Sequence, residues 1–170
     1  MRKIGEDSTQ QNADILWIPD MQREDFQFVS EKLGKQYMEE TKEIPTFPVE
    51  GFIYGLGRKC VLLTVKRNNK CIWVPFAICA GSPNIILGHD ALFALDINPT
   101  DVCKTVNVNI HGFDTLTAYH EAEDKRLRNV NLIGWAFFRD TGCYEFMQPE
   151  TMTLRLYKSW SQFMKTIKNV

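Results

Sequence analysis

The pattern of short apolar runs along this chain, separated by polar, glycine and proline residues, predicts a series of strands. Such runs are typical of buried strands, whereas strict alternation of apolar and polar residues is typical of a strand with one wet face. The runs lie at residues 15–18, 52–54, 61–65, 72–78, 85–87, 132–133, 135–138 and 144–146. Alternation from residue 102 to 110 predicts a further, half-exposed strand. The fold is therefore expected to be mainly β.

Apolar residues spaced by three and four positions predict a smaller number of amphipathic helices. These helices are expected at residues 22–40, 89–95, 115 to about 127 and after Ser159. Asp114 is the expected N-cap of the third helix, and Ser159 begins a capping box for the last one. Asn68 and Asn69 tolerate positive φ, so a hairpin turn is expected there. No internal repeat is evident in the sequence.

Composition excludes several classes of protein. With 170 residues, 44% hydrophobic and 24% charged, the chain is typical of one soluble globular domain. A formal net charge of −1 gives no global field toward nucleic acid or an anionic membrane. No apolar run approaches the roughly 20 residues that span a bilayer, so no membrane partner is expected. Five cysteines without a CxxC pair or a signal peptide predict an intracellular protein, cytoplasmic or nuclear, with reduced thiols.

The chemistry-bearing residues do not form a metal or cofactor motif. The histidines, His89, His111 and His120, are far apart and lack the spacing of a metal site. The glycines at residues 51–57 are better explained by turns than by a phosphate-binding or dinucleotide-binding loop. We therefore expect no metal and no cofactor.

The most distinctive stretch is residues 85–92, which read Ile-Ile-Leu-Gly-His-Asp-Ala-Leu. A short apolar run enters a glycine, then a polar pair, then an apolar helical pattern. This stretch resembles the Ile-Leu-Gly-Arg-Asp-x-Leu motif of the retropepsins, the aspartic proteases of retroviruses and long-terminal-repeat retrotransposons. The residues that carry the resemblance are Ile86, Leu87, Gly88 and Asp90.

The order of the other segments resembles the same family. An apolar run reaches an acid at Asp20, residues 28–33 resemble the segment that follows the catalytic loop, and the glycine-rich residues 51–58 stand near the flap position. The resemblance implies a closed β-barrel or sandwich with added helices. It implies a flexible end at 1–12, a retropepsin-like domain at 13–111 and a C-terminal α+β extension at 112–170, packed on the same domain.

The catalytic loop departs from the family pattern. In retropepsins, an Asp-Thr-Gly or Asp-Ser-Gly loop from each of two subunits brings two aspartates together to share one proton. One carboxylate then acts as the base toward water and the other as the acid toward the scissile carbonyl. Here Asp20 is followed by Met21 and Gln22, which lack the bracing hydroxyl and the small glycine. The segment Phe28-Val29-Ser30 also lies about one residue farther from Asp20 than the corresponding segment lies from the catalytic aspartate in the family pattern. We therefore expect the protease fold without protease chemistry.

A literal Asp-Thr-Gly triplet occurs later in the chain, at Asp140 to Gly142. The triplet follows the stretch 85–92, called the glycine motif below. Only a short segment comes after the triplet, and that segment contains no second pair of strands like the pair that precedes the glycine motif. Two interpretations remain open: a β-hairpin turn, for which these residues are well suited, and the catalytic triplet of a permuted lobe. We favour the turn.

The last helix carries an apolar stripe of Trp160, Phe163, Met164 and Ile167. This stripe either docks on another chain or packs against the domain's own sheet. We expect a catalytically inactive retropepsin-like domain, domesticated from a retroelement, that works as a dimerisation and protein-interaction module. A retropepsin subunit is half of an enzyme, so it keeps a face for a symmetric partner, and a homodimer is expected.

Two alternatives stay open at this point. The first is an active aspartic protease, a homodimer that uses Asp20 or Asp140. The second is a small RNA-binding factor, for which Lys158, Lys165 and Lys168 on the last helix are the candidate contacts. Lys66, Arg67 and Lys70 form a second basic cluster at one hairpin tip, where a solvated charged loop is expected.

Overall fold

The computed structural model of the chain describes residues 21–99, 105–119 and 128–168. The strands of these residues are β1 (Val49–Tyr54), β2 (Arg58–Arg67), β3 (Lys70–Ile78), β4 (Ile85–Ile86), β5 (Thr105–Ile110), β6 (Phe113–Tyr119), β7 (Leu132–Ile133), β8 (Tyr144–Gln148) and β9 (Thr153–Tyr157). The helices are α1 (Arg23–Lys32), α2 (His89–Ala94), α3 (Trp135–Thr141) and α4 (Trp160–Lys168), with a 3-10 turn at Pro149–Thr151.

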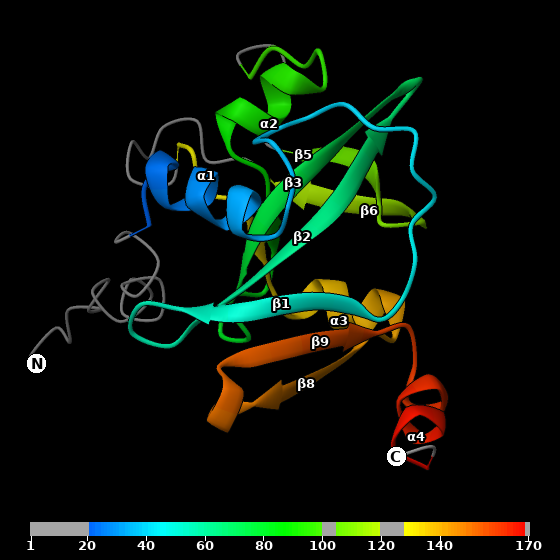
Figure 1. The fold of residues 1–170 in the computed structure, drawn as a ribbon. Helices are drawn as coiled ribbons and strands as arrows, with labels where there is room; N and C mark the ends of the chain where they lie inside the picture. The colour runs from blue at the N-terminus through cyan, green and yellow to red at the C-terminus, as the bar shows by residue number, and fades with distance from the viewer. Residues whose placement is uncertain (1–20, 100–104, 120–127, 169–170) are drawn as a thin grey trace, which may run out of the picture.

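Six of these strands form a closed barrel. The order around it is β3, β7, β4, β6, β5 and β2, and the pairing of β2 with β3 closes the ring (Figure 1). A closed ring leaves fewer unpaired strand edges than an open sheet, which is a common solution for small all-β domains. The predicted fold class, mainly β with a closed barrel and added helices, is confirmed.

The barrel contains an internal two-fold repeat that the sequence did not reveal. One unit is the antiparallel hairpin β2–β3 followed by β4 and α2, and the other is the hairpin β5–β6 followed by β7 and α3. Strand β4 runs parallel to β6 while β7 runs parallel to β3, and β4 and β7 are antiparallel to each other. Exchanging the two units therefore leaves the pairing scheme unchanged.

Glycines at equivalent places allow the two units to meet. Gly88 is the N-cap of α2 and Gly134 is the N-cap of α3, both with extended backbone. A Cβ on Gly88 would lie 2.7 Å from the carbonyl carbon of Asn129, and one on Gly134 would lie 2.2 Å from the carbonyl oxygen of Asn84. Each glycine is thus required because the neighbouring backbone passes where a side chain would begin.

A three-stranded sheet continues outward from the barrel. One edge of β2 pairs with β1 at its start and with β5 at Val65 and Lys66 near its end. The other edge of β1 pairs with β9, and β9 pairs with β8, all antiparallel. In Figure 1, β1, β9 and β8 lie together below the barrel, next to α4. Strand β1 is therefore an interior strand with neighbours on both edges.

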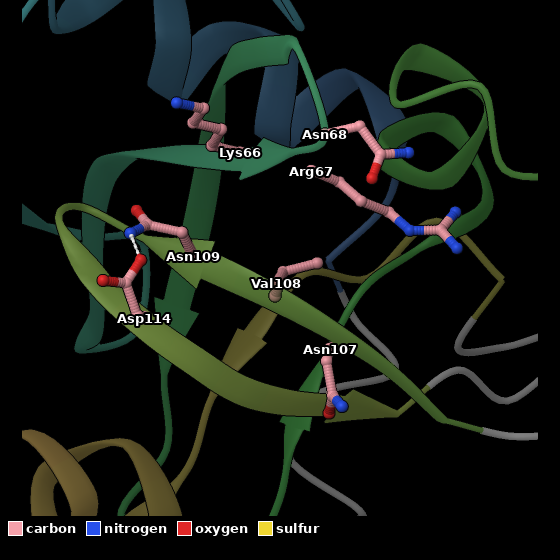
Figure 2. Close-up of a pocket in the computed structure, with 7 residues that line it drawn as sticks. All are labelled: Lys66, Arg67, Asn68, Asn107, Val108, Asn109 and Asp114. Carbon is pink, nitrogen blue, oxygen red and sulfur yellow. Dashed lines mark hydrogen bonds between the residues drawn. The ribbon is translucent and has the colours of Figure 1, made fainter.

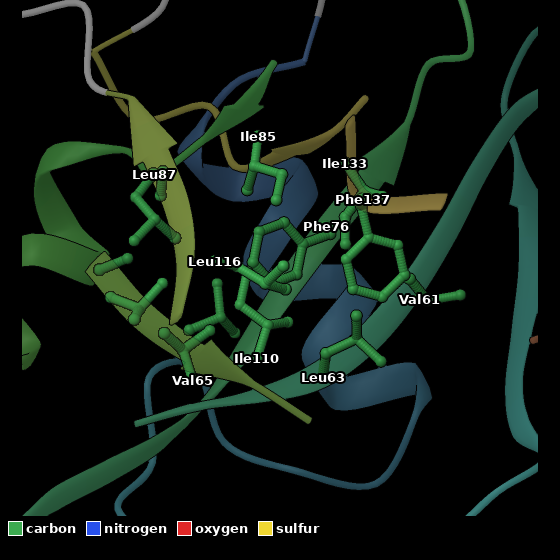
Figure 3. Close-up of a cluster of buried hydrophobic side chains, with 14 of the residues drawn as sticks. Val61, Leu63, Val65, Phe76, Ile85, Leu87, Ile110, Leu116, Ile133 and Phe137 are labelled. Atoms are coloured by element: carbon green, nitrogen blue, oxygen red, sulfur yellow. The ribbon is translucent and has the colours of Figure 1, made fainter. Parts of the chain in front are cut away.

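Two apolar clusters hold these layers together. The larger one fills the barrel, where side chains from both units meet (Figure 3). Its members in that view include Val61, Leu63, Val65, Phe76, Ile85, Leu87, Ile110, Leu116, Ile133 and Phe137. The smaller cluster lies on the outer face under α1, where Phe26 and Val29 belong to one buried group with Ile86 and Leu132 of the β4–β7 pair. Strands β4 and β7 are thus buried on both faces, as their uninterrupted apolar sequence suggests.

Two predicted elements are wrong. The helix expected from residue 115 is a strand in its described part, because β6 extends to Tyr119 and buries Leu116 and Ala118 on alternate positions. Residues 120–127 lie outside the described part of the chain. Conversely, residues 135–138 form the helix α3 rather than a strand, since Gly134 caps a helical turn that buries Phe137 and leaves Trp135 exposed.

The first predicted helix is shorter than its apolar spacing suggested. Helix α1 ends at Lys32 instead of continuing to residue 40, because Gly34 adopts a left-handed φ of 79°. The strands predicted near 52–54, 61–65, 72–78, 85–87, 132–133 and 144–146 are confirmed, as is the last helix. Two strands of the barrel, β6 and β7, come from the range 112–170, while β8, β9 and α4 are outside the barrel.

The glycine contact at Gly134 predicts a large loss of stability on substitution. Gly134→Ala should lower the free energy of unfolding by about 3 kcal/mol, because the new methyl group overlaps backbone oxygens that cannot move aside easily. Gly81→Ala is the matched control, since its Cβ would find its nearest neighbour, the Cys79 sulfur, at 4.0 Å. Urea titration of both variants measures the difference. Equal stability of Gly134→Ala and the unmodified chain would contradict the close approach.

Candidate functional site

The glycine motif lies where β4 passes into α2, next to the segment that enters β7. The Gly88 amide donates to Oδ1 of the fully buried Asn131 at 2.9 Å, and the His89 amide donates to the carbonyl of Arg128 at 2.6 Å. Ile86 and Leu87 are buried beside them, on opposite faces of the strand. The motif therefore fixes the point at which the two units of the repeat touch.

Asp90, the acid of the motif, is the centre of a polar network between α1 and α2. Its carboxylate accepts from the Arg23 guanidinium at 2.7 and 2.9 Å and from the Tyr37 hydroxyl at 3.0 Å. The Asp90 side chain is only 16% exposed. Burial, and then the negative charge of Asp90, raise the pKa of Tyr37 well above its usual range. The carboxylate therefore ties α1 to the barrel as a structural acceptor.

No pattern in the sequence indicates this network. Arg23 and Tyr37 lie 67 and 53 positions from Asp90, in a helix and in the segment after it. Asn131, the buried partner of Gly88, was also not predicted. A polar residue inside the apolar stretch 130–133 is the one signal that could have indicated a buried hydrogen bond there.

The candidate acid Asp20 lies outside the described residues. The next residue, Met21, is described and is buried at 2% exposure in the cluster under α1, together with Phe26 and Val29. Gln22 follows as the N-cap of α1. The segment after the acid therefore leads at once into a packed helix.

The second candidate acid, Asp140, is exposed at the end of α3. Its carboxylate binds the neighbouring Arg139 guanidinium at 2.5 and 2.8 Å, and this pairing lowers the pKa of Asp140. Thr141 ends the helix and Gly142 follows in the left-handed conformation, with φ of 67°. The predicted β-hairpin turn is wrong, because the triplet is a helix C-terminus that needs the glycine as its cap.

The four apolar residues of α4 have different surroundings. Phe163 is buried against the sheet, with ring centroids 5.1 Å from Tyr144 and 5.0 Å from Phe146. Met164 is half-buried, whereas Trp160 and Ile167 are 54% and 46% exposed. One side of the stripe therefore packs on the domain itself, and the other side remains at the surface.

A polar groove of about 380 Å³ lies beside the basic hairpin tip. Figure 2 shows Lys66 and Arg67 above the outward-facing residues of β5, with Asn109 donating to the Asp114 carboxylate at 2.5 Å. Lys70, the third basic residue of this tip, instead pairs with Asp96 at 2.8 Å. The carboxylate inside the groove offsets one of its two positive charges, so the groove is polar rather than strongly basic.

His111, in the turn between β5 and β6, is a buried titratable group. Its Nδ1 accepts from the Thr64 amide at 3.2 Å, so the proton of the neutral ring is on Nε2, which donates to the Thr46 carbonyl at 3.1 Å. Burial lowers the pKa of His111. The ring borders a groove of about 560 Å³ together with Trp73 and Leu62.

The described residues contain neither a cluster of metal ligands nor a membrane-spanning helix. Among residues 21–99, 105–119 and 128–168, no three His, Cys, Asp or Glu side chains come together as ligands for a metal ion. In the same residues, no helix has the length and apolar character needed to cross a membrane.

Replacing Asp90 by alanine should lower the free energy of unfolding by about 2 kcal/mol, because Arg23 and the half-buried Tyr37 hydroxyl lose their acceptor. Glu50→Ala is the matched control. Its carboxylate also binds an arginine, Arg155, at 2.9 Å, but the Glu50 side chain is 68% exposed, so the loss should stay below about 1 kcal/mol. Chemical denaturation of both variants gives the comparison, and equal losses would argue against a structural role of the network.

Stability should also depend on the protonation of His111. Because its pKa in the fold is lowered, the unfolded chain binds a proton more readily, and stability is lost as the pH falls below about 6.5. His111→Asn removes this titration and tolerates the left-handed φ of 49° at that position. Urea midpoints measured across this pH range should fall less steeply for the variant. Identical slopes for the two proteins would refute the assignment.

Comparison with known proteins bears on the fold. No protein-family model matches the chain, and no curated protein matches it. Eight chains among the solved structures do match. One of them is the crystal structure of a retropepsin-like aspartic protease from Rickettsia conorii, with 15% sequence identity and a TM-score of 0.51. The match covers 69% of this chain and 94% of that one. This chain therefore has the fold of a retropepsin-like aspartic protease.

Proposed function

We propose that this protein is a catalytically inactive retropepsin-like domain that works as a dimerisation and protein-interaction module. The observation that carries the proposal is the pairing of β1 on both of its edges. Gly51 of β1 lies opposite Val61 of β2 on one edge and opposite Leu154 of β9 on the other. The retropepsin resemblance assigns the β1–β2 hairpin to the flap position, where an enzyme needs a movable lid.

The contacts of β1 oppose such a movement. Four successive residue pairs join it to β9, and the Arg155 guanidinium binds the Glu50 carboxylate at 2.9 Å across the same edge. On the β9 side, a Cβ on Gly51 would lie 3.1 Å from Cγ of Leu154, so these two strands are in close contact. An extended substrate could not add to the outer edge of β1 unless β9 were first displaced.

The position of Met21 supports the same proposal. If the segment Phe28-Val29-Ser30 is set in the family register, the catalytic acid position moves from Asp20 to Met21. That methionine is buried under α1 and has no titratable group. Asp140 does not replace the acid, because an exposed carboxylate paired with Arg139 differs from two buried carboxylates that share a proton.

The main alternative is an active aspartic protease that uses Asp20. A second alternative, an RNA-binding factor, is favoured only by the polar groove at Lys66 and Arg67. Its Asp114 carboxylate and the absence of an aromatic side chain among its lining residues make it a poor stacking surface for bases.

A protease assay tests the proposal. The purified chain is incubated with an unstructured protein at acidic and neutral pH, with a known retropepsin-like protease as the positive control. We expect no cleavage above the buffer blank, and the same result for Asp20→Asn and Asp140→Asn. Sedimentation of the chain at micromolar concentration should give the mass of a dimer.

Cleavage that pepstatin-like inhibitors block and that Asp20→Asn abolishes would overturn the inactive assignment. Retention on single-stranded RNA that weakens steeply with salt, and that Lys66→Glu removes, would favour the RNA-binding alternative. A monomeric mass would exclude dimerisation while leaving the lack of cleavage as a separate result.

A further inference from the structure

The outer strand of the three-stranded sheet offers a surface for a second copy of the chain. In the described residues, β8 is the last strand in the order and pairs only with β9 (Figure 1). The backbone amides and carbonyls on its outer edge are therefore available to another strand. This inference rests on the dimerisation proposed above and assigns it to one edge.

Strand β8 lacks the usual features that prevent edge pairing. Its five residues, Tyr144 to Gln148, include no lysine and no proline, and they pair with β9 in five consecutive positions without a bulge. The one charged side chain, Glu145, is neutralised by the Lys59 ammonium at 2.6 Å. Nothing in the strand itself disfavours a partner.

Two barrel strands with partly unpaired edges, β3 and β5, are protected. On β3, the Cys71 carbonyl accepts from the Thr41 amide at 2.9 Å, and the Trp73 amide donates to the Glu39 carbonyl at 2.8 Å, so the preceding loop covers that edge. On β5, the register with β6 shifts between Val108 and Ile110, and such a bulge distorts an edge. The contrast makes β8 the better edge for pairing.

We propose that β8 pairs antiparallel with β8 of a second copy, about a two-fold axis at Phe146. This register uses all five residues of the strand and makes the interface self-complementary, as a two-fold dimer requires. It places Phe146 opposite Phe146 of the second copy, and Glu145 opposite Met147 of the second copy. No like charges lie opposite each other, and the two sheets become one sheet of six strands.

Exposed apolar side chains at this end of the molecule extend the surface. Met147 is 43% exposed on β8, and Trp160 is 54% exposed while its ring lies 4.8 Å from that of Tyr144. These side chains would gain burial at a joined sheet, which adds a hydrophobic contribution to the backbone hydrogen bonds. The net charge of −1 gives little repulsion between copies.

The charge placed at position 147 tests this register. Met147→Glu sets glutamates opposite each other twice in the dimer, so dimer affinity should fall by about tenfold or more. Met147→Lys sets a lysine opposite Glu145 and should preserve the dimer. Met152→Glu is the matched control, because Met152 is 47% exposed but lies in the turn before β9. Sedimentation of the full chain over a range of concentrations measures all four proteins.

The outcomes distinguish the β8 interface from the proposal that the chain dimerises. A dimer that Met147→Glu leaves unchanged, or that Met147→Glu and Met147→Lys weaken equally, overturns the β8 register but not dimerisation. A monomeric unmodified chain overturns both. Hydrogen exchange of the unmodified chain needs no variant: the amides of residues 144–148 that face away from β9 should exchange more slowly as protein concentration rises. Exchange there that does not slow while sedimentation shows the chain passing from monomer to dimer would overturn the proposal.

Discussion

The contact between β4 and β7 is the constraint on which the rest of the structure depends. Gly88 and Gly134 let the two backbones approach where any side chain would overlap a neighbour. The approach closes the barrel, since each of these short strands also joins the hairpin of the other unit. It also places Ile86 and Leu132 on one outer surface, which α1 covers. The Asp90 network then fixes α1 to α2, so that the polar contacts follow from the apolar ones.

The additions outside the barrel change what the fold can do. Strand β9 gives β1 a second neighbour, which removes the free outer edge of the β1–β2 hairpin. The same addition creates a new free edge at β8. On the function proposed above, the C-terminal segment covers the edge to which a substrate would add and provides an edge for a second copy of the chain. The retropepsin-like barrel would then persist as a scaffold for association, with the cutting chemistry no longer required of it.

The sequence predicted most of the first unit because its signals are local. Residues 85–92 combine an apolar run, a glycine and a helical pattern, and they form β4, the Gly88 turn and α2. Two elements of the second unit were predicted wrongly. Strand β6 has apolar residues at a spacing that also fits a helix, and the short apolar run at 135–138 has no clear period. The repeat stayed hidden since the units share topology and a glycine rather than sequence. Arg23, Tyr37 and Asp90 could not be connected before folding, because the chain separates them widely.

Native-state hydrogen exchange of β1 tests the central claim most directly. If β1 is a permanently paired interior strand, the amides of Val49 to Phe52 should exchange only through global unfolding, at the same free energy as those of β2 and β3. A working flap would instead open locally. Exchange of these amides at a free energy well below that of the barrel strands would contradict the account.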